Sequence, residues 1–289
     1  MNRRDFLLRL SAAVAAAPAV LAAGEGWAAD GLTSPPRKRI VYEGSDRATH
    51  YELLRYMRVS GLRDGGYELI GNRQRIRKGF DGEWGHGVYL AAVRDSRFTD
   101  IHVREVMGDG ATITAKAPDG TVHGVTRNVK ISDLHVDGAR RNGIAFIGAE
   151  RVTVQNFSIR DVRGAPRGPC AGVDFEPDAD TPGNRNLVLR NGTISDCQNF
   201  GIICDGTDTR NVLIERVTVR AHPEGWAIWP FFPGGTNVIR DCTFYGPCVH
   251  LRNVRFERCR FIMDRRYKQS NLHIASKHEN VELIDCTFE

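Results

Sequence analysis

The sequence predicts an all-β protein, a single-stranded right-handed parallel β-helix of about eight coils, and three observations support this fold. A nine-residue unit recurs along the chain from about residue 95 onward. Within each unit apolar residues alternate with polar ones, which is the period of a β-strand. The stretches between units vary in length, which is typical of coils of constant cross-section joined by loops of different size.

The eight units align without gaps. Their fourth, seventh and ninth positions are apolar in every case but one, where Gly192 stands at the seventh position. The units are DSRFTDIHV (95–103), NVKISDLHV (128–136), RVTVQNFSI (151–159), NLVLRNGTI (186–194), NVLIERVTV (211–219), TNVIRDCTF (236–244), NVRFERCRF (253–261) and NVELIDCTF (280–288). A β-sandwich of hairpins is the alternative, but the regular Asn-Gly turns that it needs are missing.

Five of these units begin with an asparagine. Asparagine accepts the left-handed backbone conformation that a tight corner requires, and it can hydrogen-bond its own backbone. The sequence therefore predicts a corner of the coil at each of these residues, which are Asn128, Asn186, Asn211, Asn253 and Asn280.

A second, shorter strand precedes most of the units. The segments are GVYL (87–90), GATI (110–113), GIAF (143–146), GVDF (172–175), GIIC (201–204) and WAIW (226–229). We expect the leading glycine to mark a tight corner. The residue after it and the one two further on should face the core, and the others should face outward. This alternation also assigns Trp229 to the core.

The cysteines follow the repeat. Cys242, Cys259 and Cys286 occupy the seventh position of their units, so we interpret them as buried free thiols. Seven cysteines without metal-finger spacing do not indicate a disulfide framework or a zinc site. A stacked pair could still oxidise outside the cytoplasm among the remaining four, which are Cys170, Cys197, Cys204 and Cys248.

Residues 1–29 are predicted to be an export signal rather than part of the fold. A paired arginine is followed by an apolar stretch that Pro18 interrupts and that is too short to span a bilayer as a helix. The segment resembles a twin-arginine export signal, through Arg3, Arg4, Phe6 and Leu7. That resemblance implies a periplasmic or secreted protein; a membrane anchor is the alternative, and no other segment is apolar enough to cross a membrane.

The remainder divides into two parts. We expect residues 30–84 to form a linker and an N-terminal cap or first coil, and residues 85–289 to form the β-helix. The sequence stops inside a repeat, at DCTFE, and an uncapped solenoid exposes strand edges and core. We therefore expect either a partner subunit over the last coil, such as a second copy of the chain, or a last coil that is left open.

The formal net charge of +5 suits acidic partners. Uronate polysaccharides and cell-surface polyanions belong to this class. The chain is not basic enough to indicate nucleic-acid binding, because it lacks long runs of lysine and arginine outside the segment PPRKR (35–39).

The stretch AGVDFEPDAD (171–180) carries the strongest functional signal. The alternation places Asp174 and Glu176 on the outer face, and GIICDG places Asp205 on the same face one coil later. Successive coils lie about 4.8 Å apart, so these three carboxylates should be close together. Like charges at such distances raise one another's pKa, which is common at functional sites. A charged strand face in contact with water is the alternative.

Three chemistries fit a cluster of Asp174, Glu176 and Asp205. Uronate lyases and C5-epimerases need a base, a group that neutralises the substrate carboxylate and an acid. Glycoside hydrolases use two carboxyl groups about 5–9.5 Å apart. A Ca²⁺ ion would also suit several carboxylate oxygens on a rigid face, alone or as the neutralising cation.

Flanking residues add candidates, since arginine pairs with carboxylates and aromatic rings stack on sugars. Arg141 and His222 are candidates for carboxylate neutralisation and proton transfer. The candidates for substrate binding are Arg140, Arg167, Trp226, Asp178 and His86.

The repeat over roughly 85–289 resembles the pectin-lyase-like superfamily of parallel β-helices. More narrowly, Asp174 in GVD and Asp205 in GIICD match two aspartates of mannuronan C5-epimerases. Glu176 stands where that family has a histidine, and Ala171 where it has a tyrosine. The resemblance implies a lyase or C5-epimerase acting on an acidic polysaccharide. A glycoside hydrolase is the alternative, and a non-catalytic polysaccharide-binding or adhesion protein is the competing class.

Overall fold

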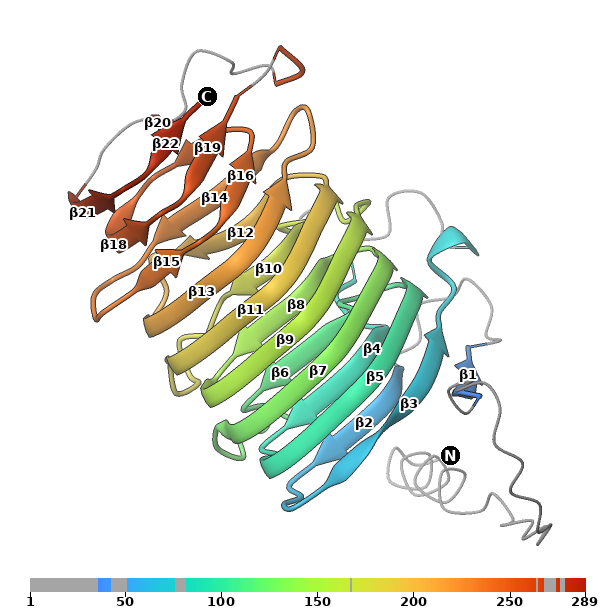
Figure 1. Cartoon of the computed structure of the whole chain (residues 1–289). Coiled ribbons are helices and arrows are strands. Elements are labelled where there is room, and N and C mark those ends of the chain that lie inside the picture. The colour runs from blue at the N-terminus through green and yellow to red at the C-terminus, as the bar shows by residue number, and fades with distance from the viewer. Residues whose placement is uncertain are drawn as a thin grey trace, which may run out of the picture. The chain divides into compact units, whose positions relative to one another are not determined.

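A computed structural model of the chain describes residues 36–42, 51–75, 82–166, 168–263, 265–267, 274–275 and 279–289 (Figure 1). It confirms the parallel β-helix: 22 strands form one continuous sheet that winds around an axis. The export signal expected at residues 1–29 lies outside the described residues. Within the part described, no helix is both long and apolar enough to span a membrane.

Two series of strands build the coils. The long series comprises β3 (Arg63–Ile70), β5 (Arg94–Val106), β7 (Thr126–Ala139), β9 (Ala149–Val162), β11 (Asn184–Cys197) and β13 (Thr209–Arg220). It continues as split strands, which are β15 (Val238–Arg240) with β16 (Thr243–Tyr245), β18 (Arg252–Glu257) with β19 (Arg260–Ile262), and β21 (Glu279–Ile284) with β22 (Thr287–Phe288). The short series comprises β2 (Glu52–Met57), β4 (His86–Ala91), β6 (Ala111–Thr114), β8 (Asn142–Ile147), β10 (Ala171–Phe175), β12 (Phe200–Asp205), β14 (Trp226–Phe231), β17 (Cys248–Val249) and β20 (Ile274–Ala275).

The β-helix begins before residue 85. β2 pairs in parallel with β4, and β3 pairs with β5, so residues 52–70 already form a coil of the same sheet. Strand β1 (Lys38–Val41) adds to β3 on the N-terminal side, and a single 3₁₀ turn, η1 (Arg73–Arg75), follows β3. Residues 52–70 are therefore the first coil, which is one of the alternatives expected for residues 30–84.

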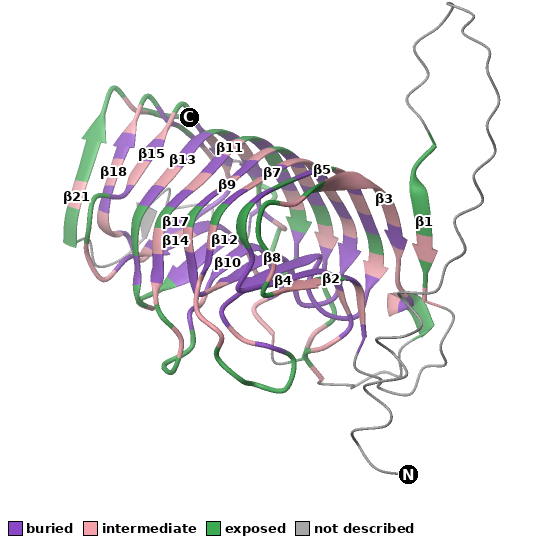
Figure 2. Ribbon diagram, turned by 90° about the horizontal axis from the view of Figure 1, so that it is seen from below, coloured by how far each residue is buried: buried purple, intermediate pink, exposed green. Residues whose placement is uncertain are grey.

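The eight nine-residue units stack in the predicted register. The fourth position pairs from coil to coil throughout, beginning with Phe98 opposite Ile131 and ending with Phe256 opposite Leu283. Buried and exposed positions alternate along these strands (Figure 2). In the first seven units the fourth and ninth positions fill the core, which includes stacked Phe244 and Phe261, whereas Leu283 and Phe288 of the last unit are exposed.

The asparagine corners are confirmed. All five unit-opening asparagines have positive φ angles, between 48° and 57°. Their side chains also bond between coils, since Asn211 Nδ2 donates to Asn186 Oδ1 at 3.2 Å and Asn280 Nδ2 donates to Asn253 Oδ1 at 3.0 Å. A second corner lies at the sixth position of every unit, which the sequence reading did not single out. Its residues, all with positive φ, are Asp100, Asp133, Asn156, Asn191, Arg216, Asp241, Arg258 and Asp285.

The glycines that lead the short strands form a column along the solenoid. They are needed because a side chain would not fit there, and not because the backbone is left-handed. None of the five glycines has a positive φ. A Cβ atom on Gly172 would lie 2.4 Å from Ile194 Cγ2 and 2.6 Å from the carbonyl oxygen of Gly201. Equivalent contacts of 2.3–2.5 Å recur at the other four, which are Gly87, Gly110, Gly143 and Gly201.

The prediction for the sixth short strand is wrong by one residue. Ile202 pairs with Ile228, so Ala227, and not Trp226, takes the place of the column glycine. Because side chains alternate along a strand, the shift moves Trp229 from the core to the outer face. There its ring stacks on His250 with centroids 3.9 Å apart.

All seven cysteines are free thiols. Cys242 and Cys259 are buried in the core column, whereas Cys286 on the last described coil is half-buried. The other four are also buried. Burial raises the pKa of Cys197 and Cys248, which keeps these thiols protonated.

We expect Gly172→Ala to destabilise the protein by about 1–3 kcal/mol, because its methyl group would overlap Ile194 and the next coil. Gly234→Ala is the matched control: its Cβ would have no heavy atom nearer than 4.0 Å, and its φ is not positive. Chemical denaturation of both variants measures the difference. Equal stability of the two would contradict the steric role of the column.

Candidate active site

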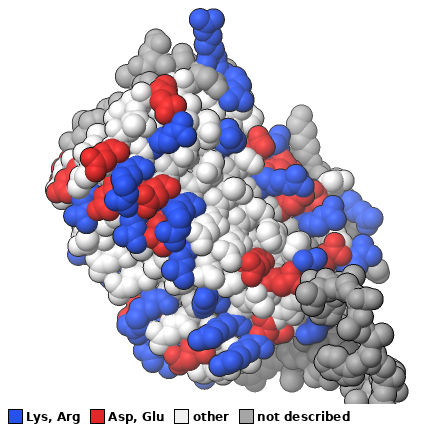
Figure 3. Space-filling model, viewed as in Figure 1, with Lys and Arg blue, Asp and Glu red and all other residues white. Residues whose placement is uncertain are grey.

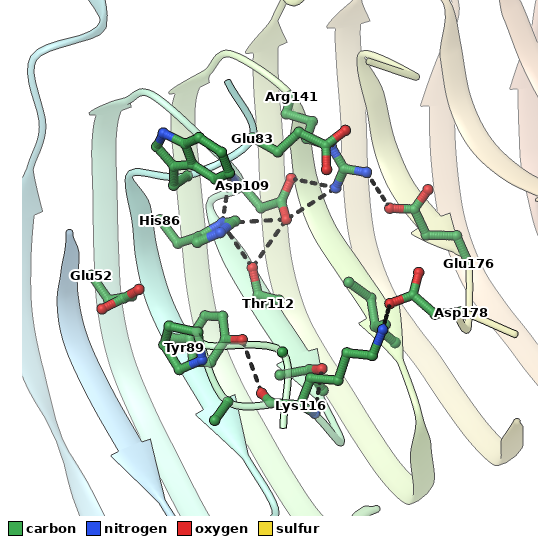
Figure 4. Close-up of a pocket in the computed structure, with 16 residues that line it drawn as sticks. Glu52, Glu83, His86, Tyr89, Asp109, Thr112, Lys116, Arg141, Glu176 and Asp178 are labelled. Atoms are coloured by element: carbon green, nitrogen blue, oxygen red, sulfur yellow. Dashed lines mark hydrogen bonds and ion pairs between the residues drawn. The ribbon is translucent and has the colours of Figure 1, made fainter. Parts of the chain in front are cut away.

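A cavity of about 200 Å³ opens on the outer face of the short strands, over β4, β6, β8 and β10 (Figure 4). Successive coils supply its walls: His86 opens β4, Asp109 precedes β6, Arg141 precedes β8 and Glu176 follows β10. Its other labelled residues are Glu52, Glu83, Tyr89, Thr112, Lys116 and Asp178.

Arg141 is the central cation of the cavity. Its Nη1 lies 3.4 Å from both carboxylate oxygens of Asp109, and its Nη2 donates to Glu176 Oε1 at 2.5 Å. Asp109 has no exposed surface, and Thr112 Oγ1 donates to its Oδ2 at 3.0 Å. Burial opposes ionisation of Asp109, but the guanidinium of Arg141 together with His86 and Thr112 outweighs it, so the pKa of this carboxyl is lowered. Asp109 and Arg141 therefore form a buried ion pair.

His86 is oriented by Asp109 and Thr112, which lie on the next coil. The main-chain N–H of Asp109 donates to His86 Nδ1 at 3.1 Å. An amide proton stays on its nitrogen, so Nδ1 must act as the acceptor. Thr112 Oγ1 lies 3.0 Å and Asp109 Oδ2 lies 3.4 Å from the same Nδ1.

Asp174 and Glu176 form a coupled pair of carboxyl groups. Asp174 is 3% exposed and accepts a hydrogen bond from Asn142 Nδ2 at 3.3 Å. Burial raises the pKa of Asp174 well above its usual range, and the charge of Glu176 and a hydrogen bond between the two side chains add to this. Burial also raises the pKa of Glu176, although Arg141 acts against it. The pair retains a proton where isolated carboxyls would lose theirs.

Lys116 forms the opposite wall with two carboxylates. Its Nζ lies 2.7 Å from Asp178 Oδ2 and 2.6 Å from Asp180 Oδ1. These hydrogen bonds raise the pKa of Lys116. The Tyr89 hydroxyl donates to the main-chain oxygen of Lys116 at 2.9 Å. Both cations that line the described part of the cavity are thus committed to protein carboxylates.

Four of the predicted site residues line this cavity, and a fifth adjoins it. Glu176, Arg141, His86 and Asp178 are in the wall, and Asp174 lies behind Glu176. The structure does not bring Asp205, His222 or Trp226 to the lining. Arg167 lies outside the described residues.

Arg140 has a different role from the predicted one. It is 4% exposed, and its guanidinium donates to the main-chain oxygens of Met107 (2.8 Å) and Gly82. These bonds hold neighbouring segments together, so Arg140 is not available to a substrate carboxylate. His222 likewise serves a turn, since its Nδ1 accepts the main-chain N–H of Glu224 at 3.3 Å.

The calcium site expected at Asp174, Glu176 and Asp205 is not assembled. Asp205 is exposed, and the carboxylate that acts on Asp174 and Glu176 is Asp109 instead, from two coils away. The fixed cation of Arg141 lies between Asp109 and Glu176. Across the described residues, no group of three or more acidic, histidine or cysteine side chains is arranged to hold a metal ion.

Sequence reasoning missed Asp109 and Lys116. A signal for Asp109 exists, because the residue before the column glycine is polar on three successive coils: His86, Asp109 and Asn142. Lys116 follows the end of β6 and precedes a tight turn, where an isolated lysine carries no pattern.

Comparisons with known proteins concern the fold. The family model for a right-handed β-helix region matches residues 80–289. The chain is similar to the SPbeta prophage-derived uncharacterized protein YorA of Bacillus subtilis (strain 168), with 26% identity over 119 residues, 40% of this chain and 20% of YorA. It is also similar to the uncharacterized protein YclG of that strain, with 23% identity over 167 residues, 51% of this chain and 29% of YclG. The chain thus spans less than a third of the length of these curated relatives.

The chain is also similar to two solved structures. The Dettilon tailspike protein gp208 has a TM-score of 0.45 and 11% identity, over 87% of this chain and 52% of the tailspike. The A-module of the Azotobacter vinelandii mannuronan C-5 epimerase AlgE6 has a TM-score of 0.39 and 9% identity, over 88% of each chain.

We expect Arg141→Met to destabilise the protein by about 3–5 kcal/mol at neutral pH, because it leaves the Asp109 charge buried without a countercharge. In the wild type the lowered pKa of Asp109 contributes stability above pH 4 or so, and this is lost as the pH falls. In the variant burial opposes the Asp109 charge without the guanidinium to offset it, so the loss of stability should grow as the pH rises. The control is Arg141→Met/Asp109→Asn, which should recover most of the stability. A double variant no better than Arg141→Met would contradict the ion pair.

A second prediction concerns the raised pKa of Asp174. Between about pH 4 and that pKa the folded protein keeps a proton that the unfolded chain releases, so wild-type stability should fall as the pH rises. The asparagine of Asp174→Asn cannot titrate, so the stability of this variant relative to the wild type should increase as the pH rises over this range, by at most about 1.4 kcal/mol per pH unit. Unfolding curves from pH 4 to 8 measure the gain. Asp180→Asn is the control: Lys116 lowers the pKa of Asp180, so this carboxyl is ionised in both the folded and the unfolded protein above about pH 4, and the stability difference from the wild type should stay flat over this range. A flat difference for Asp174→Asn would refute the shared proton.

Proposed function

The chain belongs to the right-handed β-helix family, and we propose that it is a glycoside hydrolase that cleaves a polysaccharide with the carboxyl groups of this cavity. The observation that carries the proposal is the coupled pair of Asp174 and Glu176 beside Arg141. Glycosidases need a carboxyl group that still holds a proton near neutral pH, together with a second carboxylate that is ionised.

Glu176 is the proposed general acid. Its side chain is 26% exposed in the cavity wall, so a glycosidic oxygen can approach it, whereas Asp174 behind it is almost fully buried. As the bond from the sugar to this oxygen breaks, Glu176 gives the oxygen a proton. This is the proton that the pair shares, so Asp174 passes it to Glu176, and the pair regains a proton from the water molecule whose hydroxyl group is added to the sugar. Asp174 thus positions and recharges the acid without touching the substrate.

Glu83 is the proposed second carboxylate. It faces the same guanidinium from the other side, with Oε1 3.9 Å from Arg141 Nε, and its side chain is 64% exposed (Figure 4). A carboxylate in that place can activate a water molecule or attack the sugar carbon. Arg141 fixes both carboxyl groups relative to one another, and the rings of Trp84 and Tyr89 in the lining suit a sugar ring.

A uronate lyase or C5-epimerase is the second candidate. His86 and Tyr89 line the same cavity, and an imidazole and a phenol are suited to taking and returning a proton at the sugar C5. This chemistry also needs a cation on the substrate carboxylate. Arg141 and Lys116 already hold protein carboxylates, so the described lining favours hydrolysis. Export, which the first 29 residues predict, would bring either enzyme to extracellular polysaccharides.

We expect Glu176→Gln to lower the rate of polysaccharide cleavage by about 10²–10⁴-fold, which is the usual contribution of a general acid. Alginate, polygalacturonate and neutral glycans should be tested in parallel. New reducing ends without ultraviolet absorbance indicate hydrolysis, and an unsaturated, absorbing product indicates a lyase. Glu282→Gln, an exposed carboxylate on the last described coil, should retain full activity. Binding without turnover by the wild type would leave only the non-catalytic class.

A further inference from the structure

A column of cations lies on a different face from the cavity, on the long strands of the N-terminal coils. Arg63 on β3 pairs with Arg97 on β5, and Arg97 pairs with Lys130 on β7. Their side chains point outward, because the residues that follow Arg97 and Lys130, Phe98 and Ile131, are buried in the core. Successive coils repeat at about 4.8 Å, so three positive charges follow one another at that interval.

These cations have no acidic partner within ion-pairing distance among the described residues. The same column further along the solenoid is arranged differently: Arg255 Nε lies 2.8 Å from Glu257, and its Nη1 lies 3.9 Å from Glu282. Over the C-terminal coils acidic and basic side chains are interleaved (Figure 3). The three cations on the N-terminal coils therefore lack the acidic partners that Arg255 has in the same column.

The column borders a hollow of about 480 Å³. Thr99 and Ser132 form a hydroxyl row beside the cations, and Gly65 continues that row without a side chain, because a Cβ atom there would overlap the main-chain oxygen of Thr99. The one acidic residue in the lining is Asp64, whose carboxylate is occupied by hydrogen bonds from Tyr56 and Tyr67 (2.9 Å). Stacked cations without counterions cost free energy, which a bound anion would remove.

We propose that Arg63, Arg97 and Lys130 form a binding groove for an acidic polysaccharide, whose carboxylates would follow the coil repeat along the solenoid axis. Hydroxyl groups beside the cations suit sugar hydroxyls. Single-stranded nucleic acid requires exposed aromatic rings for base stacking, and the only ring in this lining, Phe98, is buried. A membrane surface would require exposed apolar side chains, which the described lining lacks.

If the groove binds as proposed, the substrate of the hydrolase is an acidic polysaccharide. This inference rests on the proposed function only in taking the anionic ligand to be a polysaccharide. The cavity needs no cation for hydrolysis, so an anionic chain can be retained at the groove and cleaved elsewhere. Binding at the groove and cleavage in the cavity are consequently separable by mutation.

The test is binding of alginate and polygalacturonate oligomers, measured by calorimetry at low salt. Arg97→Gln/Lys130→Gln should weaken binding by roughly tenfold, since it removes two exposed ion pairs with the ligand. Arg255→Gln/Arg258→Gln is the matched control, because it removes the same charge from cations that are already paired on the same sheet. It should bind as the wild type does, and added salt should weaken wild-type binding more than that of Arg97→Gln/Lys130→Gln.

Three outcomes would overturn the groove. These are unchanged binding by Arg97→Gln/Lys130→Gln, an equal loss in both double variants, and equal wild-type affinity for a neutral glycan or single-stranded DNA. Glu176→Gln should bind the oligomers normally. If Glu176→Gln binds the oligomers but the wild type cleaves nothing, the proposed hydrolase is wrong and the groove is supported. If the wild type cleaves but the groove variants bind normally, the groove is wrong and the hydrolase is supported.

Discussion

Everything in this fold depends on the coil-to-coil register of parallel strands. Each residue of a strand lies about 4.8 Å from one counterpart on the next coil, so a sequence position becomes a column along the solenoid. Residues of the same kind in one column therefore make the same interaction on every coil. Glycines let neighbouring backbones approach, asparagines turn the corner and bond to one another, and charged residues attract or repel. The same rule that builds the core therefore also builds the sites.

The register explains how much of the fold could be predicted. The eight units carry apolar residues at fixed positions, and a one-residue slip would expose all of them, so the alignment admits one solution. The exception is instructive. Ala227 replaces the column glycine, and the segment was therefore read from Trp226, one residue too early. Glycine marks the start of a short strand in the sequence because a Cβ atom would collide at that position. Where alanine takes the position, the sequence no longer shows where the strand starts.

The site was predictable only in part, because register places backbones and does not determine side-chain reach. Asp174 and Glu176 follow from alternation. Arg140 and Arg141, however, are adjacent residues at a corner, where alternation does not apply. One reaches main-chain oxygens of earlier segments, and the other spans from Asp109 to Glu176. Their different roles depend on those partners, and Asp109 was itself missed. Long side chains at corners are thus the point at which reasoning from columns fails.

Like charges in one column repel one another, so they need either oppositely charged protein groups or a bound ligand of opposite charge. In the cavity, carboxyl groups from neighbouring coils are stabilised internally: Arg141 neutralises two of them, and Asp174 keeps a proton. On the long strands, Glu215 and Glu257 serve the arginines of the C-terminal coils in the same way. Neighbouring unit charges about 4 Å apart in water repel by about 1 kcal/mol. Arg63, Arg97 and Lys130 retain that repulsion, whereas acids beside Arg240 and Arg255 remove it on the C-terminal coils, and a bound anionic chain gives a physical reason for the difference.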